Sequence, residues 1–204
     1  MIRVHDRDRL LEMLHAVGAV RTGHFIYTSG RHGAKYVNKD ALYPDAMLTA
    51  YFCEIIADRF VKDGIEVVLA PALGGIDLKT WVSYHLSRKC GRKVYGVYAE
   101  KNSDGTAFLL RRGYETFVSG RRVLVVEDVL NTGGSIRKVL RLAESVGGIV
   151  VGAAALVDRG GFTAELLGVP KLVSVFDMPL ESWDPERCPL CRDGAPLTKG
   201  FGKT

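Results

Sequence analysis

The chain lacks any apolar run near the length of about 20 residues that a membrane-spanning helix needs. Its first eight residues are mostly polar and contain no apolar core of a secretory signal. We therefore expect no membrane partner and a cytoplasmic location. Disorder is not expected either, because 47% of the 204 residues are hydrophobic and only 25% are charged. This composition fits one α/β domain with a sizeable core.

Long runs of basic residues are also missing, although the formal net charge is +5. The basic side chains are scattered in pairs, such as Arg111 with Arg112 and Arg121 with Arg122. A surface for nucleic acid would need a denser basic patch. A multiply phosphorylated small substrate suits this charge equally well, so we expect no nucleic-acid partner.

Cysteine is scarce, with four residues in the chain. Cys53 and Cys90 fall in expected helices and are interpreted as inert thiols. Cys188 and Cys191 form a lone C-x-x-C pair, which supplies half of a four-ligand zinc site. Two more ligands would have to come from elsewhere, for example from a second subunit, whereas a thioredoxin-like redox pair would lie at a strand-to-helix turn. We predict a structural pair and no metal ligands among the site residues, with zinc left as an alternative.

The histidines show no metal-ligand spacing to one another, and each is expected to be structural. The five are His5, His15, His24, His32 and His85. No Ser/His/Asp or Cys/His arrangement for nucleophilic catalysis is found in the sequence either.

The most informative stretch runs from residue 123 to residue 135. Residues 123–126 are apolar and predict a buried strand, and Glu127 and Asp128 follow at its carboxyl end. A loop containing Thr132, Gly133, Gly134 and Ser135 comes next, before a helix whose apolar residues recur at helical spacing. The stretch has neither the Gly-Lys-Ser/Thr of a Walker A loop nor the pattern G-x-G-x-x-G.

A strand, loop and helix in this order direct free backbone N–H groups at one point, where an anion can bind. The neighbouring carboxylates suit hydroxyl groups or a divalent cation. The expected ligand therefore carries both a phosphate and a polyol, as a phosphorylated ribose does. The plain alternative is an ordinary turn with solvated acids, but open α/β sheets bind their ligands at this end of a strand.

The rest of the chain alternates between strands and helices from residue 66 onward. We predict helices at residues 6–18, 44–64, 75–88 and 132–146, and strands at 66–70, 93–99, 122–127, 149–157 and 172–176. Residues 22–42 predict a hairpin or loop outside the central sheet. The fold class is α/β, with a doubly wound, mainly parallel sheet and flanking helices. We treat residues 1–204 as one domain, with a core at 44–176 and a hood and tail at 1–43 and 177–204.

Three further segments carry polar or small residues toward the same sheet edge. Residues 70–75 are small and precede a helix, which suits a second anion site. Residues 100–112 form a polar insertion that suits a lid or, equally, a solvated hairpin. Arg159 follows a strand and can pair with a carboxylate, or else lie on the surface or pair with Asp158. Tyr36 could stack on a planar base, unless its loop is a purely structural hairpin.

Together these motifs resemble the orotate phosphoribosyltransferase family of type I phosphoribosyltransferases. The resemblance covers residues 29–31, 36–38, 71–75, 100–101, 127–135 and 158–159, and the C-x-x-C tail is similar to a bacterial or archaeal branch. It implies the type I fold and transfer of the phosphoribosyl group from phosphoribosyl diphosphate (PRPP) to orotate, with Mg²⁺ bound together with PRPP. The products are orotidine 5′-monophosphate and pyrophosphate, formed in pyrimidine biosynthesis. It also implies a homodimer in which the lid reaches the neighbouring site.

The resemblance further implies a set of site residues. Those for catalysis are Glu127, Asp128 and Lys101. Those for PRPP are Glu127, Asp128, Val129, Leu130, Asn131, Thr132, Gly133, Gly134, Ser135, Ala72, Leu73, Gly74, Lys101 and Arg111. Those for orotate are Asn131, Arg159 and Tyr36.

The sequence departs from the family pattern at several positions. Family members often have Thr at the position of Asn131, and some have Lys at Thr28 and an aromatic residue at Lys35. Many lids of the family carry a further Lys and a His, whereas residues 102–110 contain neither. We expect Arg111 and Arg112 to substitute for them. Two alternatives stay open: a phosphoribosyltransferase for another base, a purine or uracil, and a PRPP-binding or nucleotide-binding regulator of RNA on the same fold.

Overall fold

The computed structural model describes residues 7–27, 29–179 and 181–198. The chain divides into two compact units, a core unit of residues 45–179 and a second unit of residues 1–44 with 180–204. None of the helices within these described ranges has the length and apolar character needed to cross a bilayer.

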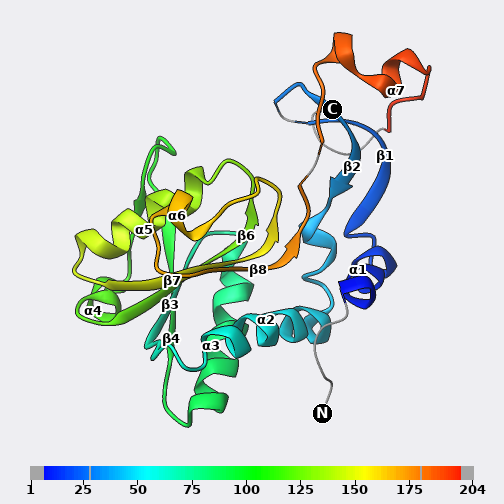
Figure 1. Cartoon of the computed structure of the whole chain (residues 1–204). Coiled ribbons are helices and arrows are strands. Elements are labelled where there is room, and N and C mark those ends of the chain that lie inside the picture. Colours follow the sequence, from blue (N-terminus) through cyan, green and yellow to red (C-terminus); the bar gives the residue numbers. More distant parts are fainter. Residues whose placement is uncertain (1–6, 28, 180, 199–204) are drawn as a thin grey trace. The chain divides into compact units, whose positions relative to one another are not determined.

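The core unit is built on a six-stranded sheet in the order β5-β4-β3-β6-β7-β8 (Figure 1). Every neighbouring pair is parallel except β4 with β5. The strands are β3 (Val67–Pro71), β4 (Tyr95–Lys101), β5 (Phe108–Leu109), β6 (Arg122–Leu130), β7 (Ile149–Asp158) and β8 (Leu172–Asp177). The helices are α2 (Ala46–Phe60), α3 (Gly75–Cys90), α4 (Glu115–Val118), α5 (Gly134–Ser145) and α6 (Ala164–Leu167). The predicted mainly parallel α/β sheet is confirmed.

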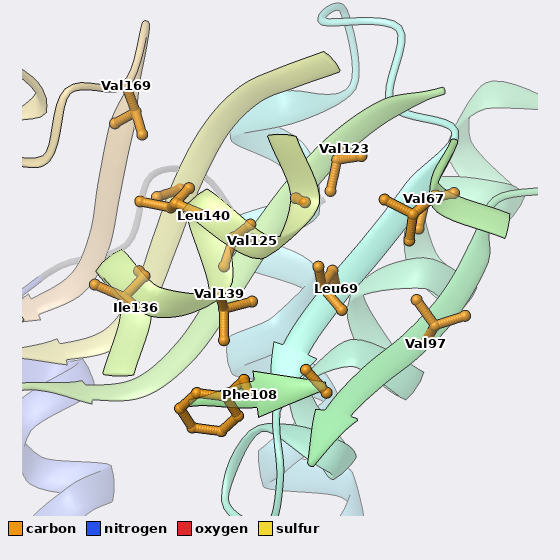
Figure 2. Close-up of a cluster of buried hydrophobic side chains, with 14 of the residues drawn as sticks. Val67, Leu69, Val97, Phe108, Val123, Val125, Ile136, Val139, Leu140 and Val169 are labelled. Atoms are coloured by element: carbon orange, nitrogen blue, oxygen red, sulfur yellow. The ribbon is translucent and has the colours of Figure 1, made fainter. Parts of the chain in front are cut away.

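Successive strand residues point to opposite faces of the sheet, and the central strands are apolar at successive positions. Both faces are therefore apolar and are covered by helices. Val67, Leu69 and Val125 belong to a buried cluster that includes Ile136 and Val139 of α5. Figure 2 shows these α5 side chains directed at the strands beneath them. On the other face α2 and α3 supply buried residues, among them Phe52, Ile56, Leu78, Val82 and Leu86.

The second unit joins the two ends of the chain. It contains α1 (Arg7–Ala16), the antiparallel pair β1 (Val20–Ile26) and β2 (His32–Val37), η1 (Lys39–Ala41), η2 (Pro185–Arg187) and α7 (Pro189–Arg192). The hairpin predicted within residues 22–42 is confirmed. The C-terminal segment packs on it: His32 and Trp183 exchange backbone hydrogen bonds of 2.8 and 2.9 Å, and Arg31 forms an ion pair with Asp184.

The structure moves several predicted boundaries. Pro44 was expected in the first turn of its helix, but α2 is capped by Asp45, whose side chain accepts from the N–H of Leu48. β6 continues to Leu130, three residues past the predicted end at Glu127, so Asp128 also lies inside the strand. The elements α4, β5 and α6 were not predicted, because each has only two to four residues and shows no periodicity.

Candidate active site

The neighbouring strands β3 and β6 mark the point where the sheet reverses its order. From β3 the chain proceeds outward to β4 and β5, and from β6 it proceeds the opposite way to β7 and β8. The loops that follow β3 and β6 therefore leave the sheet in different directions and open a crevice at the carboxyl ends of the strands. Because β3, β4, β6 and β7 are parallel, the segments that follow them lie at one edge.

Two buried carboxylates lie near the end of β6. Glu127 and Asp128 are only 6% and 8% exposed, and strand alternation directs them to opposite faces. Asp128 Oδ1 accepts the N–H of Val129 at 2.6 Å, which fixes the carboxylate. Charged side chains are rarely this buried without a ligand or partner groups to offset the lost hydration. Glu127 lines the hollow formed by the loop between β6 and α5, whereas Asp128 does not.

The loop between β6 and α5 forms a small hollow of about 90 Å³. Its lining is Glu127, Val129, Leu130, Asn131, Thr132, Gly133, Gly134, Ser135 and Ile136. The first N–H groups of a helix have no partner within the helix, so the start of α5 presents donors to this hollow. With the exception of Asp128, every predicted PRPP residue of this segment lines it.

Gly133 is required by the shape of this loop. Its φ of +71° is a left-handed conformation, and a Cβ at this position would lie 2.8 Å from the ring of Phe162. Arg137 supports the same turn, because its guanidinium donates to Leu166 O and lies 5.4 Å from the Phe162 ring centroid. Arg137 also donates to Thr132 O at 3.3 Å. Its role was missed, since Leu166 and Phe162 lie 29 and 25 residues away along the chain.

The second predicted anion loop follows β3. Ala72 donates to Ala99 O at 2.7 Å, which ties this loop to the end of β4, and the Ala72–Leu73 peptide is cis. Leu73 is 84% exposed, so the turn stands open to a ligand. Gly75 begins α3, and a Cβ there would lie 2.6 Å from the Cβ of Ala70, so only glycine lets the helix start this close to the strand.

Arg159 lies beside the β6 loop at the end of β7. Its N–H donates to Leu130 O at 2.8 Å, which places it next to Asn131 along the sheet edge. The neighbouring Asp158 is 3% exposed and accepts three backbone N–H groups, from Gly160, Gly161 and Phe162, at 2.7–3.0 Å. Asp158 therefore shapes the turn that follows Arg159. The sequence Asp-x-Gly-Gly signals such a turn, although this role was not predicted.

The insertion at residues 100–112 is a hairpin. β4 and β5 pair through Glu100 with Leu109 and Lys101 with Phe108, and Asp104 closes the turn by accepting from Thr106. Arg111 and Arg112 both form ion pairs with Glu100. Lys101 is exposed on the same hairpin, at the carboxyl end of β4. A lid function of this hairpin stays a prediction.

The remaining residue predicted for the base belongs to the second unit. Tyr36 lies on β2 and is half-buried, with its ring centroid 5.5 Å from that of Phe25. Lys35, one of the departures from the family pattern, is exposed on the same strand. Thr28 lies outside the described residues. The core unit thus brings together the residues 72–74, 127–135 and 159, whereas Tyr36 belongs to the other unit.

Comparison with known proteins identifies the family. A family model described as phosphoribosyl transferase domain matches residues 47–187. The orotate phosphoribosyltransferase of Pelotomaculum thermopropionicum is 39% identical over 193 residues, which cover 95% of this chain and 96% of that protein. The chain belongs to the orotate phosphoribosyltransferase family. The resemblance predicted from the motifs is thereby confirmed, and so is the type of enzyme, a pentosyltransferase.

Solved structures of the family have the same fold. The orotate phosphoribosyltransferase of Mycobacterium tuberculosis, in complex with Fe(III) dicitrate, has a TM-score of 0.67 at 27% sequence identity, covering 84% of this chain and 96% of that chain. The same enzyme in complex with PRPP has a TM-score of 0.61, with the same identity and coverage.

Proposed function

We propose that the carboxyl edge of β3, β6 and β7 is the active site at which this orotate phosphoribosyltransferase transfers the phosphoribosyl group of PRPP to orotate. The reaction yields orotidine 5′-monophosphate and pyrophosphate in pyrimidine biosynthesis. One observation carries the assignment of the site: two loops suited to anions, residues 71–75 and 131–135, follow the neighbouring parallel strands β3 and β6, and β6 carries a pair of buried carboxylates. A ribose with a phosphate at each end requires this arrangement, and a relative of known structure is named as a complex with PRPP.

The N-terminal turn of α5 holds the 5′-phosphate in this proposal. Backbone N–H groups of residues 132–135 and the hydroxyls of Thr132 and Ser135 donate to its oxygens. The turn after β3, Ala72 to Gly74, receives the pyrophosphate in the same way. Gly133 keeps the first loop close to the ligand because it carries no side chain.

Glu127 and Asp128 bind the ribose hydroxyls at the carboxyl end of β6, next to the reacting carbon. As the bond from C1′ to the pyrophosphate oxygen breaks, the electron pair leaves with pyrophosphate and positive charge develops on the ribose ring. The fixed carboxylates stabilise that charge, and N1 of orotate donates the electrons of the new bond to C1′. Catalysis then depends on positioning and electrostatics, without a covalent nucleophile.

A magnesium ion fits this set of residues. Carboxylate oxygens, together with the oxygens of a diphosphate, are the ligands that Mg²⁺ prefers, and Glu127 and Asp128 supply the carboxylates. When bound with PRPP, the ion neutralises charge on the departing pyrophosphate.

Arg159, Asn131 and Tyr36 are proposed to select orotate. The guanidinium of Arg159 can form a two-point contact with orotate's carboxylate, which purines and uracil lack. Asn131 hydrogen-bonds the pyrimidine edge in place of the more frequent Thr. Stacking of the base is the role that the sequence predicts for Tyr36. The relatives named above act, by their names, on orotate, and this favours orotate over another base and over an RNA regulator.

Other parts of the proposal concern the assembly. Lys101 and Arg111 contact the pyrophosphate when the hairpin closes, and in a homodimer the hairpin reaches the neighbouring site. The two units act as a single phosphoribosyltransferase domain, with residues 1–43 and 177–204 as hood and tail, in a cytoplasmic enzyme.

Loss of orotate absorbance on mixing the purified protein with PRPP, Mg²⁺ and orotate tests the function. We expect a loss that requires both PRPP and Mg²⁺, and a much slower reaction with uracil, hypoxanthine or adenine. If orotate is not consumed but PRPP still raises the melting temperature, the assignment of the PRPP site stands and orotate is not the base that the enzyme accepts. If PRPP has no effect on the melting temperature either, the site assignment fails.

A further inference from the structure

Four side chains that could hold a metal ion meet in the second unit. His24 lies on β1, His32 on β2, and Cys188 and Cys191 flank the start of α7. Their ligand atoms all lie within 4.8 Å of one another. His24, His32 and Cys188 are buried, at 3%, 7% and 2% exposure, and Cys191 closes the cluster from the outside. The two ligands that the C-x-x-C pair lacks thus come from the same chain.

The distances in this cluster come within about 0.4 Å of those expected for a tetrahedron around a zinc ion. Zn–S bonds of about 2.3 Å and Zn–N bonds of about 2.05 Å place neighbouring S and N atoms about 3.6 Å apart and two N atoms about 3.3 Å apart. The observed S···N separations are 3.5, 3.6 and 3.2 Å, and the Nε2 of His24 lies 2.9 Å from Nδ1 of His32.

The orientation of His24 also suits a metal ligand. Its Nδ1 lies 2.8 Å from the carbonyl oxygen of Ala195, which can only accept a hydrogen bond. Nδ1 must therefore carry the proton, and Nε2 directs a lone pair toward the two sulfurs and His32. Metal-binding histidines are commonly fixed in this way by a carbonyl on the other ring nitrogen.

A redox function fits the same cysteines less well. A reactive C-x-x-C pair lies where a strand leads into a helix, with its thiols facing the ligand. Here Cys188 follows η2 rather than a strand, and the helix α7 that comes next has only four residues. His24 lies within contact distance of both sulfurs and His32 within contact distance of the Cys191 sulfur, and the four side chains make a closed set of ligands, which is typical of structural zinc sites.

A metal ion bound by these four side chains would stabilise the second unit, which has a small apolar core. This unit is assembled from residues 1–44 and 180–204 and has a small buried apolar set, including Leu10, Leu14, Phe25 and Leu42. Units of this size commonly require a metal ion or disulfides because they bury too little apolar surface.

We propose that His24, His32, Cys188 and Cys191 bind one structural zinc ion, which fastens the C-terminal segment to the β1–β2 hairpin. Soft thiolates with imidazoles in a tetrahedral set select zinc over the hard cation that accompanies PRPP. The site is separate from the proposed active site in its residues and in its chemistry.

Metal analysis of the untagged protein, purified under reducing conditions, tests the proposal. We expect about one zinc per chain in the wild type and less than about a tenth of that in Cys191→Ser and His32→Asn. Cys90→Ser and His15→Gln serve as matched controls, because Cys90 and the exposed His15 lie outside the cluster, and both should retain zinc. Replacement by Co²⁺ in the wild type should give the visible bands of tetrahedral cobalt with thiolate ligands, a result that does not depend on how well a variant folds.

Several outcomes would overturn the zinc site. The first is a reduced wild-type protein that contains no zinc and gives no tetrahedral cobalt spectrum. The second is an equal zinc content in Cys191→Ser and the wild type. The others are another metal bound in stoichiometric amount and a Cys188–Cys191 disulfide in the freshly isolated protein. None of these readouts measures orotate turnover, so the zinc proposal can fail while the proposed function stands.

Discussion

At the scale of single residues, a substitution of Asp128 can test its proposed catalytic role without disturbing the fold. Asp128→Asn keeps the shape of the side chain and an oxygen that can accept the N–H of Val129, but it removes the negative charge beside the ribose. We expect kcat to fall by a factor on the order of 10²–10³, as when one electrostatic contact to a transition state is lost, with little change in melting temperature. Steady-state orotate turnover and a thermal melt measure the two effects.

Glu144→Gln is the matched control, because it removes an exposed carboxylate from the C-terminal turn of α5 and should leave turnover unchanged. Near-normal activity of Asp128→Asn would remove Asp128 from the proposed site.

Substitutions of Arg159 test whether this residue recognises the carboxylate of orotate. Arg159→Ala should raise the KM for orotate far more than the KM for PRPP, because only orotate offers a carboxylate to the guanidinium. Arg159→Lys should recover only part of the loss, since an ammonium keeps the charge without the two-point geometry. The exposed Arg141 of α5 provides the control, Arg141→Ala. Equal rises in both KM values would place Arg159 outside the base site.

At the scale of elements, the α2–α3 layer contains a histidine that responds to pH. His85 Nε2 is buried with no hydrogen-bond partner among the described residues, and burial lowers the pKa of His85 from its ordinary value of 6.5. The folded chain therefore binds this proton less tightly than the unfolded chain does. As the pH falls below about 6.5, the unfolded state takes up more protons and the folded state loses stability.

We expect His85→Gln to lose less stability than the wild type on acidification, because the variant has no proton to take up at this position. Urea midpoints at about pH 7.5 and about pH 5.5 would measure the difference, with the exposed His15→Gln as control. An equal decline in all three proteins would show that other groups cause the acid sensitivity.

At the scale of the whole molecule, the proposed dimer makes a prediction about shared sites. If the 100–112 hairpin serves the neighbouring subunit, Lys101→Ala on one subunit and Asp128→Asn on the other damage the same site of a mixed dimer, and the second site remains intact. After subunits exchange at random, about a quarter of wild-type activity should return from two nearly inactive variants. Each variant mixed with itself is the control, and no recovery in proven mixed dimers would confine the hairpin to its own site.

The sequence by itself determined the parts of the protein that depend on local order. The apolar strand, the two acids and the glycine-containing loop of residues 123–135 predict a ligand site because hydrophobic periodicity and backbone freedom act over a few residues. The alternation of strands and helices predicted the parallel sheet for the same reason. Boundaries shifted at α2 and β6, where a capping side chain and pairing with β7 override local preference.

Only the tertiary structure decided which distant residues meet. Arg137 supports the Gly133 loop through Leu166 and Phe162, which lie 29 and 25 residues away along the chain, so no local pattern encodes these contacts. His24 and His32 looked unrelated to Cys188 and Cys191 because more than 150 residues separate the pairs. Pairing of the hairpin with the C-terminal segment brings all four within 4.8 Å, since a metal-like cluster is defined by distance in space and not by spacing along the chain.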